Sequence, residues 1–337
     1  MKALVFDTFG DATVLQYREL DCPTLKTPLG PFDMLLRMHA IGLNFADVYR
    51  RQGRYHLQGE PPYIAGYEGA GEVVELGSEL SRWIDEGLES AIRIGDLIGF
   101  ADVPFANAEL VIVNYEKAIP LSKGISTRVA ASVLLQGLTA HYLTRDSFQI
   151  KSGSICLVHA AAGGVGQLLV QIITMMGGTA IGLTSSEDKA QVAKKCGCKH
   201  VTLYNTNWKE EVLTLTNGKG VDVVYDSVGS TLMDSFGACR VGGTVVFYGM
   251  AGGDPPHVDP RMLMDTSKTL TGGDLWNVLT SREERIKRAN ELFSWIESGK
   301  IVVESPTEFQ LENGKEAHEF LEGRRSTGKI LLTCTKE

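Results

Sequence analysis

Cysteine is sparse in this chain of 337 residues, and its spacing follows no paired pattern. The six cysteines are scattered, no C-x-x-C pair occurs, and Cys196 and Cys198 stand too close together for an ordinary zinc-binding pair. This excludes a disulfide scaffold and a zinc knuckle. It predicts reduced thiols that are mostly buried.

Long apolar runs are also missing. No uninterrupted stretch reaches the roughly 18 residues that a membrane helix needs. Asp7 and Asp11 interrupt the N-terminal segment where a signal peptide would carry its apolar core. We therefore expect a soluble protein located in the cytoplasm.

An excess of positive charge is absent as well. Lysine and arginine number 33 against 41 aspartates and glutamates, which gives a formal net charge of −8. This balance argues against nucleic acid as the main ligand. With 43% apolar residues the chain can bury sizeable cores, so the disordered class is excluded too.

What the sequence does contain is two different patterns, and the first indicates a mostly antiparallel β domain. Up to about residue 125, short apolar or alternating runs are separated by clusters of Gly, Pro, Asn and Asp. The acidic stretch Leu80–Ile92 is typical of a helical surface insertion between two strands. The predicted strands are Ala3–Phe6, Met34–Ile41, Gly71–Leu76, Asp96–Phe100 and Leu110–Val113.

From Ser126 onward, strands and helices alternate. The strands are continuously apolar, as strands covered on both faces are, and the repeated β-α units predict a doubly wound parallel sheet. The predicted elements are strand Ile155–His159, helix Val165–Met176, strand Thr179–Leu183, helix Glu187–Cys196, strand His200–Leu203, helix Trp208–Leu215, strand Val221–Tyr225, helix Thr231–Cys239 and strand Thr244–Tyr248.

The C-terminal segment departs from this alternation. A long helix is predicted after the capping box formed by Thr280 and Glu283, and a strand over Ile330–Thr333 closes the chain. One helix and one strand cannot bury a core of their own, so both should return to the N-terminal domain. We expect the α/β domain, residues 127–270, to be inserted into a β domain of residues 1–126 and 271–337. The apolar face of the helix is Ile286, Ala289, Leu292, Phe293 and Ile296.

The segment 155–166 carries the strongest chemical signal. Its glycine pattern resembles G-x-G-x-x-G with Ala161 in the first position, followed by Gly163 and Gly166. The pattern follows a buried strand and precedes an apolar helix, where glycines let backbone approach a pyrophosphate. We interpret it as a dinucleotide site; the alternative is a tight turn that binds nothing.

The end of the next strand indicates which dinucleotide is bound. An NAD site would place an acidic residue there, whereas this chain has Ser185, with Lys189 one helical turn further on. Small hydroxyls and a lysine suit the 2′-phosphate of NADP(H). The alternative is that Ser185 only caps the helix, with Asp188 as its partner.

Several segments together resemble the zinc-independent quinone oxidoreductases, the ζ-crystallin-like branch of the medium-chain dehydrogenase/reductase superfamily. The resemblance runs from end to end and implies a GroES-like β domain carrying an inserted Rossmann domain, as a homodimer that uses NADPH. The segments are NFADVYRRQGRY (44–55), PPYIAGYEGAGEV (61–73), LLQGLTAHYL (134–143), VHAAAGGVGQ (158–167) and VVYDSVG (223–229).

The resemblance also bears on metal binding. Zinc-dependent relatives carry a catalytic cysteine where this chain reads Gly42–Asn44, and a Gly-His-Glu motif where it has Gly66–Glu68. Tyr67 is no substitute for a histidine ligand, so no metal is expected. The histidines His39, His141 and His159 are interpreted as packed core residues.

Residue roles in cofactor binding follow from the resemblance alone. Gly163, Gly164, Val165 and Gly166 are expected to hold the pyrophosphate, and Ser185, Lys189 and Tyr204 the 2′-phosphate. The nicotinamide ribose and carboxamide are assigned to Asn44, Gln136 and Thr139, and Ser227 and Gly249 are expected at later strand ends that face the cofactor.

The catalytic candidates are Asn44, Asp47, Tyr49 and Tyr55, and either tyrosine can donate a hydrogen bond to the acceptor oxygen. For both tyrosines, packing alone is the alternative. The nearby arginines 50, 51 and 54 are interpreted as solvated surface, with steering of acidic substrates as the alternative.

Three functions are open at this stage. The first is NADPH-dependent reduction of a quinone by hydride transfer, without metal or flavin. The second is reduction of an enone or alkenal double bond. The third is a crystallin-like or RNA-binding protein that retains NADPH.

Overall fold

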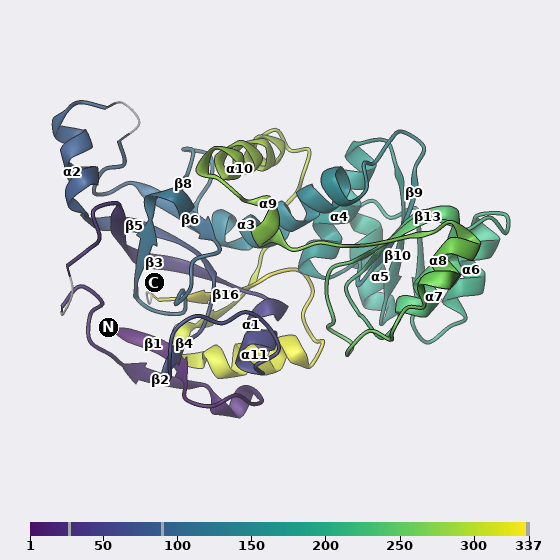
Figure 1. Cartoon of the computed structure of the whole chain (residues 1–337), viewed down its shortest axis with the longest axis horizontal. Coiled ribbons are helices and arrows are strands. Elements are labelled where there is room, and N and C mark those ends of the chain that lie inside the picture. The colour runs from purple at the N-terminus through teal and green to yellow at the C-terminus, as the bar shows by residue number, and fades with distance from the viewer. Residues whose placement is uncertain (26–27, 89–90, 335–337) are drawn as a thin grey trace. The chain divides into compact units, whose positions relative to one another are not determined.

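A computed structural model describes residues 1–25, 28–88 and 91–334 (Figure 1). It divides into two compact units. Unit 1 comprises Met1–Leu135, Leu279–Glu297 and Val303–Glu337, and unit 2 comprises Gln136–Val278 and Ser298–Val302. Unit 2 is therefore inserted into unit 1 along the chain, which agrees with the predicted fold class. The predicted domain limits at residues 126 and 270 stay predictions.

Unit 1 is built mainly of antiparallel strands. Its strands are β1 (Lys2–Phe6), β2 (Gln16–Glu19), β3 (Asp33–Leu43), β4 (Tyr63–Ile64), β5 (Glu68–Leu76), β6 (Leu97–Ala101), β7 (Leu110–Asn114), β8 (Ile119–Pro120), β15 (Thr307–Gln310) and β16 (Ile330–Thr333). Its helices are α1 (Phe45–Arg51), α2 (Ser78–Asp85), α10 (Arg282–Glu297), α11 (Gly314–Glu322) and most of α3 (Thr127–Tyr142).

The end of the chain completes the main sheet of unit 1. The strand order is β15-β16-β3-β5-β6-β8, with β7 also paired to β3, and a smaller sheet has the order β2-β1-β4. In the antiparallel pairing of β16 with β3, Leu332 lies opposite Ile41. Both are fully buried in one core together with Phe6, Phe100 and Leu321 of α11. The predicted return of the last strand is therefore correct.

Two local predictions in unit 1 need correction. The acidic stretch Leu80–Ile92 does not simply lie on the surface, because α2 begins at Ser78 and Leu80 is buried in the core; residues 89–90 lie outside the described part. In α10, the cap is Ser281, whose Oγ accepts from Glu284 N at 3.2 Å, and not Thr280.

The buried face of α10 also differs from the prediction. Ala289, Leu292 and Phe293 are buried as expected, whereas Ile286 and Ile296 are only half-buried. Arg285 and Trp295, which were not predicted to face the core, are buried instead. Arg285 is accommodated because its Nη1 donates to Glu116 O at 2.7 Å and its Nη2 to Leu279 O at 3.1 Å.

Unit 2 is the doubly wound α/β unit. Its strands are β9 (Ile155–His159), β10 (Thr179–Thr184), β11 (His200–Leu203), β12 (Val221–Asp226), β13 (Cys239–Phe247) and β14 (Thr269–Gly272). Its helices are α4 (Gly164–Met175), α5 (Glu187–Lys195), α6 (Trp208–Leu215), α7 (Leu232–Ala238), α8 (Pro260–Thr266) and α9 (Leu275–Val278).

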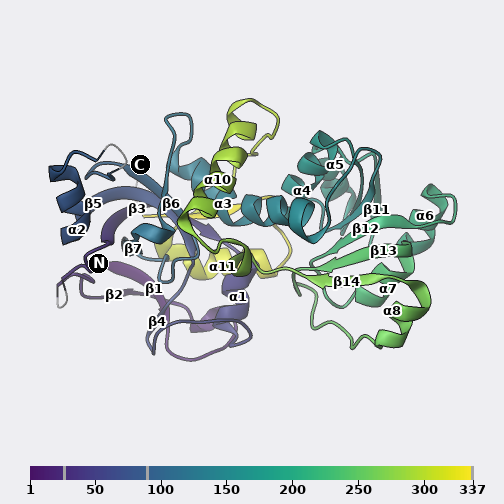
Figure 2. The ribbon, with the colours of Figure 1, turned by 45° about the horizontal axis from the view of Figure 1, so that its top comes forward.

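All strand pairs of this sheet are parallel, in the order β11-β10-β9-β12-β13-β14. Figure 2 shows α4 and α5 on one face of the sheet and α7 on the other. The strand order reverses between β9 and β12. In open α/β sheets, ligands bind at the carboxyl ends of the strands beside such a reversal.

The cysteines are free thiols, as predicted. Cys156, Cys198 and Cys239 are buried, and Cys334 is partly buried. Burial raises the pKa of Cys198 to about 12, that of Cys239 to about 11 and that of Cys334 to about 12. The pKa of Cys156 is raised further by the same cause.

The histidine predictions are correct for two residues. His141 and His159 are buried, but His39 is half-buried, with its Nε2 3.9 Å from Glu72 Oε2. Among the described residues, no helix combines the length and apolar character that crossing a membrane requires.

Candidate active site

The turn between β9 and α4 is shaped by its glycines. An added Cβ on Gly166 would lie 2.3 Å from Ala160 O and 2.8 Å from Ala161 Cα, so only glycine permits this close approach of helix to turn. On Gly163 it would lie 3.1 Å from Ala160 O, and Gly163 N donates to that oxygen at 2.8 Å. The tight turn is thus followed directly by the start of a helix.

This arrangement fits a dinucleotide. Gly163 caps α4, and the N–H groups in the first turn of a helix are the ones that no preceding helical carbonyl accepts. Such groups bind phosphate oxygens together with the positive end of the helix dipole. The missing Cβ atoms on Gly164 and Gly166 let the first turn of α4 pack closely against Gln136 and the Ala160 carbonyl. The residues present therefore fit the cofactor that the sequence predicts.

At the strand end that should hold the 2′-phosphate, the structure corrects one prediction, the residue that caps α5. The cap of α5 is Ser186, whose Oγ accepts from Lys189 N at 3.4 Å, whereas Ser185 is exposed at the end of β10. Capping therefore does not require Ser185, and the alternative explanation of that serine is wrong. Lys189 is half-buried in the first turn of α5. Tyr204 N donates to Thr184 O at 3.0 Å, so Tyr204 follows β11 beside the same strand end.

Four other residues of unit 2 were predicted to bind the cofactor. Ser227 and Gly249 follow strands β12 and β13, and Gln136 and Thr139 lie in α3, before the glycine turn. An added Cβ on Gly249 would lie 3.1 Å from Ser227 O, so the ends of β12 and β13 adjoin at these two residues. The side chain of Gln136 packs against Gly164 so closely that a Cβ there would lie 1.9 Å from its Oε1. Thr139 is buried in α3.

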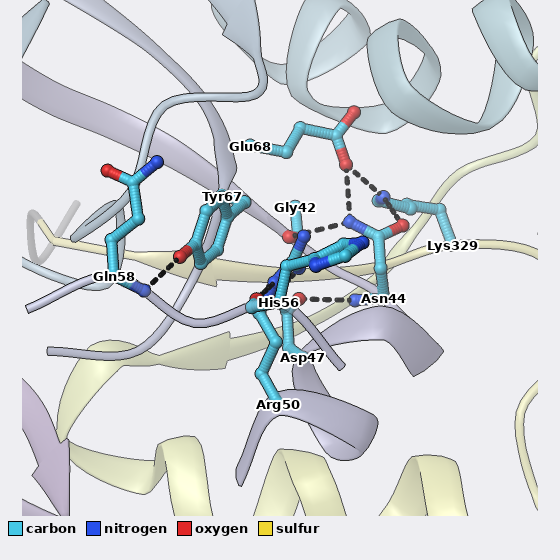
Figure 3. Close-up of polar contacts among 9 residues, drawn as sticks. All are labelled: Gly42, Asn44, Asp47, Arg50, His56, Gln58, Tyr67, Glu68 and Lys329. Atoms are coloured by element: carbon cyan, nitrogen blue, oxygen red, sulfur yellow. Dashed lines mark hydrogen bonds and ion pairs between the residues drawn. The ribbon is translucent and has the colours of Figure 1, made fainter. Parts of the chain in front are cut away.

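In unit 1, a buried polar cluster surrounds Asn44 (Figure 3). Asn44 follows β3 and caps α1, and its Nδ2 donates to Glu68 Oε2 at 2.8 Å and to Gly42 O at 3.2 Å. The Nζ of Lys329 donates to Asn44 Oδ1 at 3.0 Å and to Glu68 Oε2 at 2.5 Å. The other oxygen of Glu68 accepts from Leu135 N at 2.7 Å.

The same cluster continues through Asp47. Its Oδ2 accepts from Asn44 N at 2.9 Å, and its Oδ1 accepts from Arg50 Nη1 at 3.2 Å. The Arg50 guanidinium also lies 3.6 Å above the centre of the Tyr67 ring. Burial raises the pKa of the Asp47 carboxyl, and the Arg50 charge partly offsets this. Burial likewise raises the pKa of the Tyr67 hydroxyl, which accepts from Gln58 N at 3.0 Å.

Two of the three arginines near this cluster were misjudged from the sequence. Arg50 is 2% exposed and Arg51 is fully buried, so only Arg54 lies on the solvated surface. Arg51 Nη2 donates to Glu322 Oε1 of α11 at 2.7 Å. Arg50 and Arg51 are structural cations inside the unit, and neither explanation given from the sequence holds for them.

The two predicted catalytic tyrosines have different surroundings. Tyr55 is half-buried, and the Arg50 guanidinium lies 5.0 Å from the centre of its ring. Tyr49 is half-buried on α1, with its ring 6.2 Å from that of Phe45. Through Arg50, Tyr55 is adjacent to the cluster that contains Asn44 and Asp47.

Sequence reasoning missed Glu68 and Lys329 as members of this cluster. Glu68 could have been suspected from the sequence, because it is a carboxylate within the glycine-rich strand β5. Lys329 directly precedes the buried strand β16, where a lysine needs a partner. No spacing rule connects them, because 261 positions separate the two residues.

The side chains at these positions also bear on metal binding. Among the described residues, no group of three or more His, Cys, Asp or Glu side chains is arranged to hold a metal ion. At the two segments where zinc-dependent relatives have ligands, Asn44 and Tyr67 make the hydrogen bonds given above. The ammonium group of Lys329 supplies the positive charge next to Glu68.

Comparisons with known proteins agree with this architecture. Residues 30–145 match the family described as the alcohol dehydrogenase GroES-like domain, and residues 164–295 match the one described as zinc-binding dehydrogenase. A quinone oxidoreductase of Pseudomonas aeruginosa is 37% identical over 335 residues, covering 98% of this chain and 99% of that protein.

Two further relatives are informative. A 2-haloacrylate reductase of a Burkholderia species is 35% identical over 309 residues, covering 90% of this chain and 91% of that protein. The crystal structure of Escherichia coli quinone oxidoreductase in complex with NADPH superposes with a TM-score of 0.91 at 33% identity. The superposition covers 99% of this chain and 100% of the Escherichia coli chain.

Proposed function

Since the chain belongs to the quinone oxidoreductases of the medium-chain dehydrogenase/reductase superfamily, we propose that it reduces a quinone with NADPH. The observation that carries this proposal is the glycine turn of unit 2, where Gly166 lets α4 approach the turn closely. NADPH supplies a hydride from C4 of its nicotinamide. Everything else required of the protein is binding, orientation and charge stabilisation.

In this proposal, the chain's residues divide between two tasks. Gly163, Gly164, Val165 and Gly166 hold the pyrophosphate, whereas Ser185, Lys189 and Tyr204 form the 2′-phosphate end of the site. Asn44, Gln136 and Thr139 orient the nicotinamide half, and Ser227 and Gly249 face the cofactor from the ends of β12 and β13.

The proposed catalytic residues are Asn44, Asp47, Tyr49 and Tyr55. Tyr55 or Tyr49 donates a hydrogen bond to the acceptor oxygen, where negative charge develops during hydride transfer. Asp47 and Arg50 hold Asn44 and Tyr55 in position, because Asp47 accepts from Asn44 N and Arg50 lies against the Tyr55 ring.

A second candidate is the reduction of a carbon–carbon double bond conjugated to a carbonyl or carboxyl group. The similarity to the 2-haloacrylate reductase favours it. The requirements on the protein are the same, since a hydride is delivered and the developing oxyanion needs a donor. The difference lies in the acceptor atom.

The test is a titration of the apoprotein with NADPH and with NADH, followed by nicotinamide fluorescence. 1,4-Benzoquinone or 9,10-phenanthrenequinone is then added to the complex. Tight binding that prefers NADPH, with oxidation on quinone addition, supports quinone reduction. Binding without oxidation by quinone but with oxidation by 2-chloroacrylate supports the second candidate. Absence of binding refutes both, and also the third class considered from the sequence, which retains NADPH; only the fold would then remain.

A matched pair of variants controls the titration. Gly166→Ala places a methyl group 2.3 Å from Ala160 O and should abolish binding of both nucleotides. Gly272→Ala makes the same change where an added Cβ meets nothing within 4 Å, so it should bind like the parent protein.

We also propose that the chain forms a homodimer and is located in the cytoplasm. The outer edge of β14 supports the dimer, since an edge strand presents backbone groups that a second copy can pair with. Light scattering in solution tests the dimer, and cell fractionation tests the location.

A further inference from the structure

The segment that connects α1 to β4 in unit 1 carries Tyr55 and forms neither helix nor strand. Gly53, with φ +72°, and Gly59, with φ +92°, stand near its two ends. Between them the side chains at positions 54, 56 and 58 are exposed, and those at 55 and 57 are half-buried. A segment with so little buried surface takes a fixed shape only where its backbone is bonded to more rigid parts of the protein.

Two buried side chains bond to this backbone. Arg50 Nε donates to His56 O at 2.9 Å, and the Tyr67 hydroxyl accepts from Gln58 N at 3.0 Å (Figure 3). Arg50 is 2% exposed and Tyr67 is 4% exposed. Both bonds directly follow Tyr55 along the chain, so they fix the backbone next to that tyrosine.

The Arg50 side chain also joins the two tyrosine rings. Its guanidinium lies 3.6 Å from the centre of the Tyr67 ring and 5.0 Å from the centre of the Tyr55 ring. A cation is attracted to the face of an aromatic ring, most strongly where water is excluded. The Tyr67 ring therefore stabilises the position of the guanidinium, which in turn contacts Tyr55.

The backbone of Tyr67 is itself firmly held. Its carbonyl oxygen accepts from Asp102 N at 2.8 Å and from Val103 N at 3.2 Å. The preceding Gly66 has φ +88°, and an added Cβ there would lie 1.9 Å from Asn107 Oδ1. By the resemblance described above, zinc-dependent relatives have a histidine ligand at position 67. In this chain the same well-anchored position carries a hydroxyl that holds a neighbouring segment.

We propose that Tyr67 is a positioning residue for the reduction, because with Arg50 it fixes the segment 55–58 and so the location of the Tyr55 side chain. The inference rests on the proposed function, in which Tyr55 or Tyr49 donates to the acceptor oxygen, and it identifies Tyr55 as that donor. A donor on an exposed segment is preorganised only when rigid elements hold that segment.

The experiment measures turnover of NADPH with 1,4-benzoquinone by the full-length variant Tyr67→Phe, which loses the hydroxyl and keeps the ring against Arg50. We expect kcat to fall about 3- to 10-fold, since one hydrogen bond to the segment is lost. The dissociation constant of NADPH should stay within about twofold of that of the parent protein, because the glycine turn of unit 2 is unchanged.

A residue-specific measurement and a matched control accompany this comparison. In Tyr67→Phe, the Gln58 amide should exchange with water about 3- to 10-fold faster by NMR, because it has lost its acceptor. Tyr17→Phe removes a hydroxyl from the exposed surface of β2 in the same unit, so it should change neither kcat nor the exchange of Gln58. Unchanged Gln58 exchange in Tyr67→Phe would overturn the inference.

A double-mutant cycle distinguishes positioning of Tyr55 from a general structural effect. If Tyr67 acts through Tyr55, then Tyr67→Phe should lower kcat by less than about 1.5-fold once Tyr55→Phe is present. An equal loss in both backgrounds, or a parental kcat in Tyr55→Phe alone, would contradict the inference.

Failure of the proposed function has a different signature. In that case the parent protein oxidises NADPH with neither 1,4-benzoquinone nor 2-chloroacrylate. Faster Gln58 exchange in Tyr67→Phe would then still support the hold of Tyr67 on the segment, whereas its role in the reduction would be refuted.

Discussion

Removal of the Lys329 ammonium group should destabilise unit 1 strongly. The side chains of Lys329 and Glu68 are 4% and 0% exposed, and their charged atoms are 2.5 Å apart. With Arg50 and Asp47, the cluster contains two cations and two anions, so Lys329→Met leaves one buried negative charge without compensation. Breaking a buried pair on one side costs about 3–5 kcal/mol. We expect a loss near the lower end, about 3 kcal/mol, because Leu135 N and Asn44 Nδ2 still donate to Glu68.

The assay is hydrogen exchange followed by mass spectrometry on peptides from β3 and β5, which report the opening free energy of unit 1 itself. This avoids treating two compact units as one unfolding transition. The matched control is Lys2→Met, whose Nζ lies 3.1 Å from Glu19 Oε2 with both side chains well exposed. That change should cost about 0–1 kcal/mol.

A second substitution separates charge from packing. In Lys329→Met with Glu68→Gln, the uncompensated charge disappears and the amide can still accept from Leu135 N, so most of the lost stability should return. A single-variant loss no larger than that of Lys2→Met would refute the reasoning, since it would mean that water reaches Glu68.

Three further predictions concern charge and pH. Lys189→Ala should weaken NADPH binding about 10- to 100-fold, as expected for one charge-assisted bond, and NADH hardly at all; equal losses in a fluorescence titration would rule out its 2′-phosphate role. Arg50→Met removes the cation that offsets the burial of Asp47, so the pKa of Asp47 should rise further; thermal denaturation should show a penalty that becomes smaller as the pH is lowered and the carboxyl takes up a proton. Burial, together with the nearby Arg51, lowers the pKa of His318 to about 3, so the unfolded chain binds the proton first. Stability should therefore fall as the pH drops below about 6.5, by about 2 kcal/mol at pH 5, and His318→Leu should show a flatter acid limb in urea titrations.

The regular parts of the fold could be predicted because their signals are local. The prediction for β9 agrees in both bounds with the structure, and that for α5 differs by one residue at its end. Each helix cap was predicted one position too early. The structure has Ser186 and Ser281 as the caps, where Ser185 and Thr280 were predicted. In both cases two hydroxyl residues are adjacent, and which one turns toward the helix depends on backbone angles that composition does not determine.

The turn for the cofactor could likewise be found from sequence, because its glycines, strand and helix are contiguous. The cluster around Asn44 could not. It depends on pairing between β3, β5 and the far end of the chain, and charged residues such as Arg50 and Lys329 are ordinarily exposed. Only the tertiary structure reveals that each is buried with a carboxylate.

The state of the thiols has a consequence for the proposed reduction of quinones. Quinones are electrophiles that alkylate thiolates, and a thiol whose pKa is raised by burial is almost entirely protonated near neutral pH. Cys156, Cys198, Cys239 and Cys334 are all in this condition. At these four positions, burial that serves packing would also shield the protein from covalent inactivation by the quinone proposed as its substrate.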